Sequence, residues 1–307
     1  MTAPVIEFRD VTRTFGRRRA LDGVALAVEP GEVVALVGRN GAGKTTALRL
    51  AHGVLWPDSG AIRVLGLDPV RQGLDVRTRA SLLSEESALY PWMTVREILA
   101  FGGALAPRWD ARLASSLVER LGLEPGAKIR TLSRGTKAKV ALALAVAARP
   151  EVLLLDDPTA GLDPLVRREV LEGILEALPG DGGAVLYASH LINDLERVAD
   201  RVVFLDAGRV RLEGSIEALK QRVRRLTAVF EEAVPPGAIE GLPEGTLDRR
   251  SDGRALSIVA DAAHAERLES HVRSLRCVHL EWEPLDLEEI LIAALRSGGP
   301  GRETSHV

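Results

Sequence analysis

The segment GRNGAGKT, residues 38–45, carries three glycines between two stretches of different character. Before it, GEVVALVG (31–38) is an apolar run typical of a buried strand, and after it GKTTALRLAHGVL (43–55) has the spacing of a helix. Glycine permits the tight turn that such a connection needs, and it lets backbone N–H groups point inward at an anion. The pattern therefore predicts a loop that wraps phosphate at the start of a helix.

The residue types of this loop predict Mg-ATP as the ligand. Lys44 can reach the β- and γ-phosphates, and the Thr45 hydroxyl can ligate Mg²⁺. An ordinary glycine-rich turn is the alternative, but the flanking strand and helix lie where a phosphate loop needs them. The loop residues that we expect to contact the phosphates are Gly38, Asn40, Gly41, Ala42 and Gly43.

Two carboxylates end an apolar strand in EVLLLDDPTAGLD, residues 151–163. Val152 to Leu155 run directly into Asp156 and Asp157, and burying such a pair is costly unless a cation lies opposite. In a phosphate-loop protein, an acid at the end of a neighbouring strand helps to hold Mg²⁺. Asp156 is therefore predicted to be a magnesium ligand.

The order of the elements predicts an α/β fold with a mostly parallel core sheet, because strands alternate with helices. A small antiparallel β subdomain is expected near the N-terminus, and residues 72–150 have helical character. The pattern changes after about residue 214, where short strands and two helices predict a small α+β domain. The expected domains are thus 1–214 and 215–297, followed by a disordered tail at 298–307.

Composition excludes several classes of protein. The net charge of −3 does not indicate a nucleic-acid-binding surface, and a single cysteine, Cys277, excludes an internal disulfide framework. The start of the chain has no apolar core of a signal peptide. The longest near-continuous apolar stretch, VALALAVAA (140–148), is far shorter than the ~20 residues of a membrane span.

A third motif, TLSRGTKAK (131–139), precedes Asp156. Ser133 is positioned to cap a helix that begins near Thr136, which would make a second anion site. Together with the phosphate loop and Asp156, this segment resembles the signature motif of ABC transporter ATP-binding subunits, especially ABC-2-type exporter subunits. The resemblance covers residues 4 to about 214 and implies a phosphate-loop ABC ATPase domain.

The resemblance implies further roles for individual residues. Phe15 matches the aromatic that stacks on adenine, although a plain core aromatic is an alternative. Thr46 matches the residue that supports the α-phosphate, and His190 matches the switch histidine at the γ-phosphate. Asp163 lies in AGLD (160–163), which matches the loop that crosses to the opposing subunit.

The resemblance also implies partners. In the family, the serine and glycine that Ser133 and Gly135 match contact the γ-phosphate bound by a second subunit, so the expected unit is a homodimer or heterodimer of cassettes. A polytopic membrane permease is the other expected partner, with no nucleic acid. The expected location is cytoplasmic, peripheral on the inner face of the cell membrane.

Three positions depart from the family pattern. Arg134 replaces the usual glycine of the signature, and Glu85 (or Glu86) replaces the glutamine that approaches Mg²⁺ and the reacting phosphate. Asp157 replaces the glutamate that acts as general base. Its carboxylate would lie one methylene further back, and a misplacement of about 1 Å can cost ~10²-fold in rate. A slow ATPase is the hypothesis, and a merely tolerated substitution is the alternative.

Other functions stay open on the sequence. A cassette that senses ATP with little hydrolysis would explain Asp157 and Glu85, and soluble ABC ATPases act on ribosomes or DNA. The segment ALYPWMTVREI (88–98) matches the groove for a membrane subunit. Its Leu89, Tyr90, Trp92 and Met93 suit either an interface or local core filling.

Overall fold

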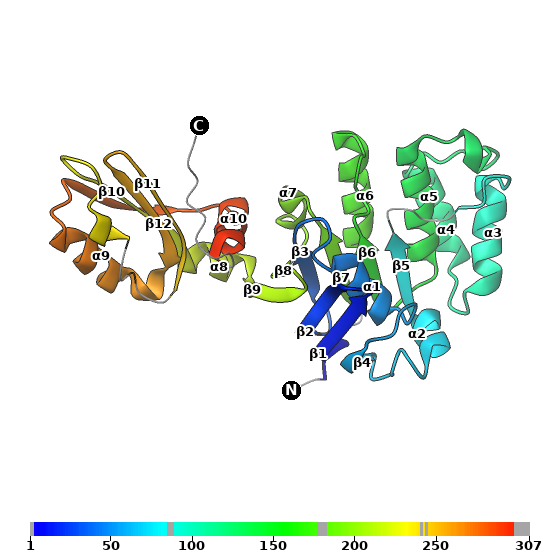
Figure 1. Ribbon diagram of the computed structural model, residues 1–307. Coiled ribbons are helices and arrows are strands. Elements are labelled where there is room, and N and C mark those ends of the chain that lie inside the picture. The colour runs from blue at the N-terminus through cyan, green and yellow to red at the C-terminus, as the bar shows by residue number, and fades with distance from the viewer. Residues whose placement is uncertain (1–2, 85–88, 177–182, 240–241, 243–244, 298–307) are drawn as a thin grey trace. The chain divides into compact units, whose positions relative to one another are not determined.

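The structure is a computed structural model that describes residues 3–84, 89–176, 183–239, 242 and 245–297 (Figure 1). Glu85, Glu86 and the expected tail at 298–307 lie outside the described residues. The chain forms two compact units, Met1–Val210 and Arg211–Val307. None of the described helices is both long enough and apolar enough to cross a membrane.

A six-stranded sheet forms the centre of the first unit (Figure 1). Its order is β5 (Ala80–Ser84), β6 (Val152–Asp156), β7 (Ala184–Ser189), β3 (Val33–Val37), β8 (Arg201–Asp206) and β9 (Arg209–Ser215). The edge strand β9 begins in the first unit and continues past its last residue, Val210. The strands from β5 to β8 are parallel. Every residue of β3, β6 and β7 is buried, because a parallel sheet is covered on both faces. The predicted α/β class is confirmed.

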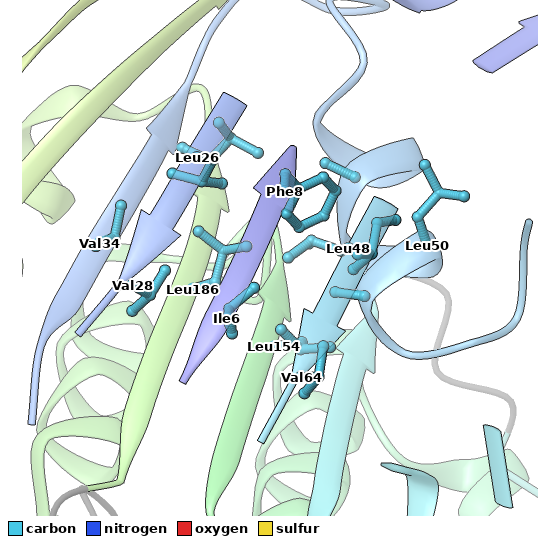
Figure 2. Close-up of a cluster of buried hydrophobic side chains, with 14 of the residues drawn as sticks. Ile6, Phe8, Leu26, Val28, Val34, Leu48, Leu50, Val64, Leu154 and Leu186 are labelled. Carbon is cyan, nitrogen blue, oxygen red and sulfur yellow. The ribbon is translucent and has the colours of Figure 1, made fainter. Parts of the chain in front are cut away.

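A second, antiparallel sheet packs close to this one. It consists of β2 (Arg18–Val28), β1 (Ile6–Phe15) and β4 (Ser59–Val64). Figure 2 shows Phe8 and Leu26 from this sheet in one cluster with Leu48 of α1 (Lys44–Ala51) and Leu154 and Leu186 of the parallel sheet. This shared core holds α1, and with it the phosphate loop, between the two sheets.

The first unit contains further helices besides α1. They are α2 (Gly73–Arg79), α3 (Val95–Leu105), α4 (Ala111–Arg120), the 3₁₀ turn Ile129–Thr131, α5 (Arg134–Ala147), α6 (Pro164–Glu176) and α7 (Ile192–Leu195). Those from α2 to α5 make up the helical region expected at 72–150. Thr94 and Glu97 form a capping box that starts α3. Residues 80–84 differ from the helical character expected across 72–150, because they pair with β6 as strand β5. That pairing is a tertiary contact that local periodicity does not reveal.

The second unit is an antiparallel sheet with helices, in the α+β style. Its order is β11 (Thr246–Asp252), β12 (Ala255–Asp261), β10 (Val223–Val229) and β13 (His279–Pro284). Its helices are α8 (Ile216–Arg222), α9 (Ala265–Ser274) and α10 (Leu287–Ser297), with 3₁₀ turns at Pro236–Ala238 and Ala262–His264. Leu226 and Leu268 belong to one buried cluster, and Val259 and Ile290 belong to another.

Candidate nucleotide-binding site

The phosphate loop connects β3 to α1, and two of its glycines are required by close backbone approaches. A Cβ on Gly38 would lie 2.1 Å from the carbonyl oxygen of Leu205 in β8. Gly43 has φ of 114°, and a Cβ there would lie 2.3 Å from the carbonyl oxygen of Ala20. The loop is therefore pressed against β2 and β8 with no room for side chains at these positions.

Lys44 lies inside the loop. Its side chain is buried, and Nζ donates to the carbonyl oxygens of Gly38 at 2.7 Å and Arg39 at 3.3 Å. Burial lowers the pKa of the Lys44 ammonium, and the carboxylates of Asp157 and Asp156 oppose that shift. The loop thus holds a cation where bound phosphates would need one.

Thr45 and Asp156 meet across 111 positions of sequence. The Thr45 hydroxyl donates to Asp156 Oδ1 at 2.9 Å, because α1 starts beside the end of β6. Burial raises the pKa of the Asp156 carboxyl, the Thr45 hydrogen bond opposes this, and the charge of Asp157 adds to it. A buried carboxylate beside a hydroxyl is an oxygen donor pair of the kind that Mg²⁺ prefers. The residues present therefore fit a magnesium ion shared with substrate phosphates.

Replacing Asp156 with Asn should stabilise the magnesium-free chain. The raised pKa means that the folded state binds a proton at higher pH than the unfolded state, so stability falls as pH rises from the unfolded value of ~3.9 through the folded value. Asp156→Asn removes that cost, and in EDTA at pH 7.5 we expect a melting temperature higher by about 2–4 °C.

Thermal unfolding in EDTA at pH 7.5 and at pH 3.5 measures this effect. The gain should shrink at the lower pH, where the wild-type carboxyl is itself protonated. Asp75→Asn, at an exposed position of α2, is the matched control and should change little. A lower melting temperature for Asp156→Asn at both pH values would contradict the prediction.

Asp157 lies against His190, which follows β7. Asp157 Oδ1 accepts from the His190 backbone N–H at 3.2 Å and lies 3.0 Å from His190 Nδ1. Asp157 has φ of 45°, a left-handed conformation that aspartate adopts more readily than glutamate. The backbone therefore supplies a local reason for aspartate at this position. The Asp157 side chain is 13% exposed and that of His190 45%.

The other predicted residues of the loop side are placed as follows. Phe15 is 44% exposed at the end of β1, and Arg13 Cζ lies 4.7 Å from its ring centroid. This exposure excludes the alternative of a buried core aromatic. Asn40 is exposed, Ala42 is buried, and Thr46 is partly buried in the first turn of α1.

The signature segment forms a separate cluster with the AGLD loop. Ser133 Oγ accepts from the Thr136 N–H at 3.1 Å and caps α5, as predicted. A Cβ on Gly135 would lie 3.1 Å from Val166 Cγ1 in α6, and Asp163 Oδ1 accepts from the N–H of Val166 at 3.1 Å. The structure thus brings Ser133, Gly135 and Asp163 together at the starts of α5 and α6. The phosphate loop lies at the start of a different helix, α1.

The sequence does not predict one hydrogen bond to the backbone of the phosphate loop. The Arg18 guanidinium donates to the carbonyl oxygen of Gly41. Arg18 lies in the run Arg17–Arg19, and such a run usually marks a solvated turn. Its position three residues after Phe15 is the signal that could have pointed to the site, because a short hairpin brings these two residues opposite each other.

Comparisons with known proteins agree with this geometry. The ABC transporter family model matches residues 21–160. The daunorubicin resistance ATP-binding protein DrrA3 of Streptomyces coeruleorubidus is 38% identical over 285 residues, which cover 90% of this chain and 89% of that protein. The chain belongs to the ABC transporter ATP-binding subunits. ABC cassettes are ATPases, and this chain is therefore an ABC ATPase.

Further relatives and solved structures fit the same family. ABC transporter ATP-binding protein YtrB of Bacillus subtilis is 28% identical, covering 97% of this chain and 100% of that protein. A solved ATP-binding subunit of an ABC transporter superposes with a TM-score of 0.65 at 28% identity, over 71% of this chain and 92% of that one. The bacterial ABC cassette MJ0796, solved as a dimer, gives 0.61 at 26% identity, over 68% of this chain and 98% of that one.

Proposed function

We propose that this ABC cassette is the ATP-hydrolysing subunit of an export complex and holds Mg-ATP between two cassettes. The observation that carries the proposal is the convergence of Lys44, Thr45, Asp156, Asp157 and His190 at one end of the core sheet. Similarity to DrrA3 extends over 90% of the chain, and so includes residues of both units. The name of that relative describes drug resistance.

A relative that exports supports the direction of transport. Nod factor export ATP-binding protein I of Paraburkholderia xenovorans is 37% identical over 71% of this chain and 73% of that protein. The sulfate/thiosulfate import protein CysA of Bradyrhizobium diazoefficiens is also 37% identical, but over 69% of this chain and 64% of that protein. Identity alone therefore does not separate the directions, but the match covers a larger share of the Nod factor export protein than of the import protein, 73% against 64%, which favours export.

Each residue of the site has a proposed role in hydrolysis. Lys44 binds the phosphates and Asp157 accepts the proton of the attacking water, while His190 orients the Asp157 carboxylate through its backbone N–H and ring nitrogen. Thr45 and Asp156 would hold Mg²⁺, which neutralises charge on the phosphates when bound. Phe15 stacks on the adenine from its exposed position.

Two partners complete the proposed complex. Ser133 is exposed at the start of α5, so a second cassette could bring its phosphates to this helix end, and the dimeric MJ0796 cassette supports that arrangement. Tyr90, Trp92 and Phe101 form an exposed aromatic cluster, with centroids 5.2 Å and 5.5 Å from Tyr90. We propose that a membrane permease docks there, which places the cassette on the inner face of the membrane. The second unit is proposed as an accessory domain.

Mg-ATP hydrolysis by the purified chain, and its co-purification with a polytopic membrane protein, test the function. Hydrolysis together with such a partner supports the exporter subunit. Co-sedimentation with ribosomes or DNA would instead indicate a soluble ABC ATPase. Binding of ATP without hydrolysis, even with the membrane partner present, would favour an ATP-sensing cassette.

Asp157→Glu tests whether the shorter carboxylate slows hydrolysis. A glutamate carboxylate reaches one methylene further towards the water, and we expect kcat to rise by roughly tenfold or more. Glutamate fits the left-handed backbone less well, so stability should fall by about 1 kcal/mol. Steady-state hydrolysis and thermal unfolding measure the two effects. Unchanged turnover would mean that Asp157 is tolerated rather than rate-limiting.

A further inference from the structure

The hairpin formed by β1 and β2, which carries Phe15, lies beside the phosphate loop. Phe15 and Arg18 are paired across the hairpin, so the turn between β1 and β2 has only two residues. β2 then runs past the loop, and the Ala20 carbonyl oxygen lies 2.3 Å from where a Cβ on Gly43 would be. The proposed adenine platform and the phosphate loop are therefore neighbours in space, although they are separate elements of the chain.

Arg18 adds a side-chain link between these two elements. Its Nη2 donates to the carbonyl oxygen of Gly41. Gly41 has φ of 82°, and a Cβ there would lie 2.2 Å from that same nitrogen. A glycine at this position is what lets the guanidinium reach the loop backbone, so the contact depends on the loop's own sequence.

Two cationic side chains thus hold carbonyl groups of the loop. Lys44 Nζ donates to those of Gly38 and Arg39, and Arg18 donates to that of Gly41. Each contact restrains the peptide group whose carbonyl it binds, and the Ala42 N–H of the peptide group held by Arg18 donates in turn to the Arg39 carbonyl oxygen at 3.0 Å. The difference between the two cations is their origin. Lys44 belongs to the loop itself, whereas Arg18 comes from the hairpin.

We propose that Arg18 is a positioning residue that ties the adenine platform at Phe15 to the phosphate loop. The proposal rests on the nucleotide site proposed above. With this contact, the hairpin and the phosphate loop are already in their relative positions before the base and the phosphates of a nucleotide bind. Without it, nucleotide binding must itself order the two elements, and the cost of that ordering lowers the affinity. A phosphate ligand without a base needs the loop alone, and Lys44 still holds that loop.

Titration calorimetry with ADP and with pyrophosphate, both in the presence of Mg²⁺, tests the tie without needing hydrolysis or a partner cassette. For Arg18→Ala we expect ADP affinity to fall about fivefold, the scale of the net contribution of one typical hydrogen bond. Pyrophosphate affinity should stay within about twofold, since the base platform does not contribute to it. Arg18→Lys should recover part of the ADP affinity.

Arg17→Ala is the matched control, because Arg17 is the exposed neighbour in the same turn. It should leave both affinities unchanged, and thermal unfolding checks that each variant is folded. Unchanged ADP affinity in Arg18→Ala would overturn the proposal. An equal loss for pyrophosphate would also overturn it, because Arg18 would then serve the phosphate loop alone. Equal affinities of the wild-type chain for pyrophosphate and ADP would show that Phe15 does not bind the base, and this too would overturn the proposal. Failure to bind either ligand would overturn the proposed function.

Discussion

Asp157→Asn should lower kcat for Mg-ATP hydrolysis by about 10²–10⁴-fold while nucleotide binding persists. The amide oxygen of asparagine can still accept from the His190 N–H that now binds Asp157 Oδ1. Asparagine also tolerates the left-handed backbone at this position, so the loop should keep its shape. The amide cannot accept a proton from water, so the substitution should slow only the hydrolysis step.

Measuring both the steady-state turnover and the ADP affinity of Asp157→Asn separates an effect on hydrolysis from an effect on nucleotide binding. Removing one negative charge near Lys44 and the phosphates should leave binding equal or tighter. Asp75→Asn, an exposed aspartate of α2, is the matched control and should retain wild-type turnover. If Asp157→Asn kept turnover within twofold of the wild type, another group would have to be the base.

Gly38→Ala should destabilise the first unit by about 3 kcal/mol and abolish tight nucleotide binding. Its Cβ would lie 2.1 Å from the Leu205 carbonyl oxygen, where no side chain can move aside because the obstacle is strand backbone. Either the phosphate loop or β8 must shift, and β8 is paired with β3 directly before the loop. The steric clash should therefore distort both β8 and the phosphate loop.

Urea unfolding and ADP titration measure the two consequences of this change. Gly126→Ala is the matched control, since a Cβ there meets nothing within 4 Å and its φ is not left-handed. The control should change stability by less than about 0.5 kcal/mol. A Gly38→Ala chain with wild-type stability and ADP affinity would show that the loop and β8 can separate without cost.

Much of the fold could be read from local patterns. Apolar runs predict β3 and β6, and helical spacing predicts α1 after the phosphate loop. Ser133 caps α5 as its place before Thr136 predicts. Such features depend on residues a few positions apart, and so they survive in a single sequence. Strand β5 does not, because ASLLS becomes a strand only through pairing with β6.

The site shows the same division between near and distant residues. The phosphate loop, with Lys44 and Thr45 at its end, can be read from residue order, because a glycine-rich turn and a helix start depend on neighbouring residues. Tertiary packing, by contrast, set the contact of His190 with Asp157 and that of Arg18 with Gly41. It also decided that Phe15 is exposed. These properties depend on strand register and hairpin placement, since contacts across long separations arise from tertiary packing, which local sequence patterns do not reveal.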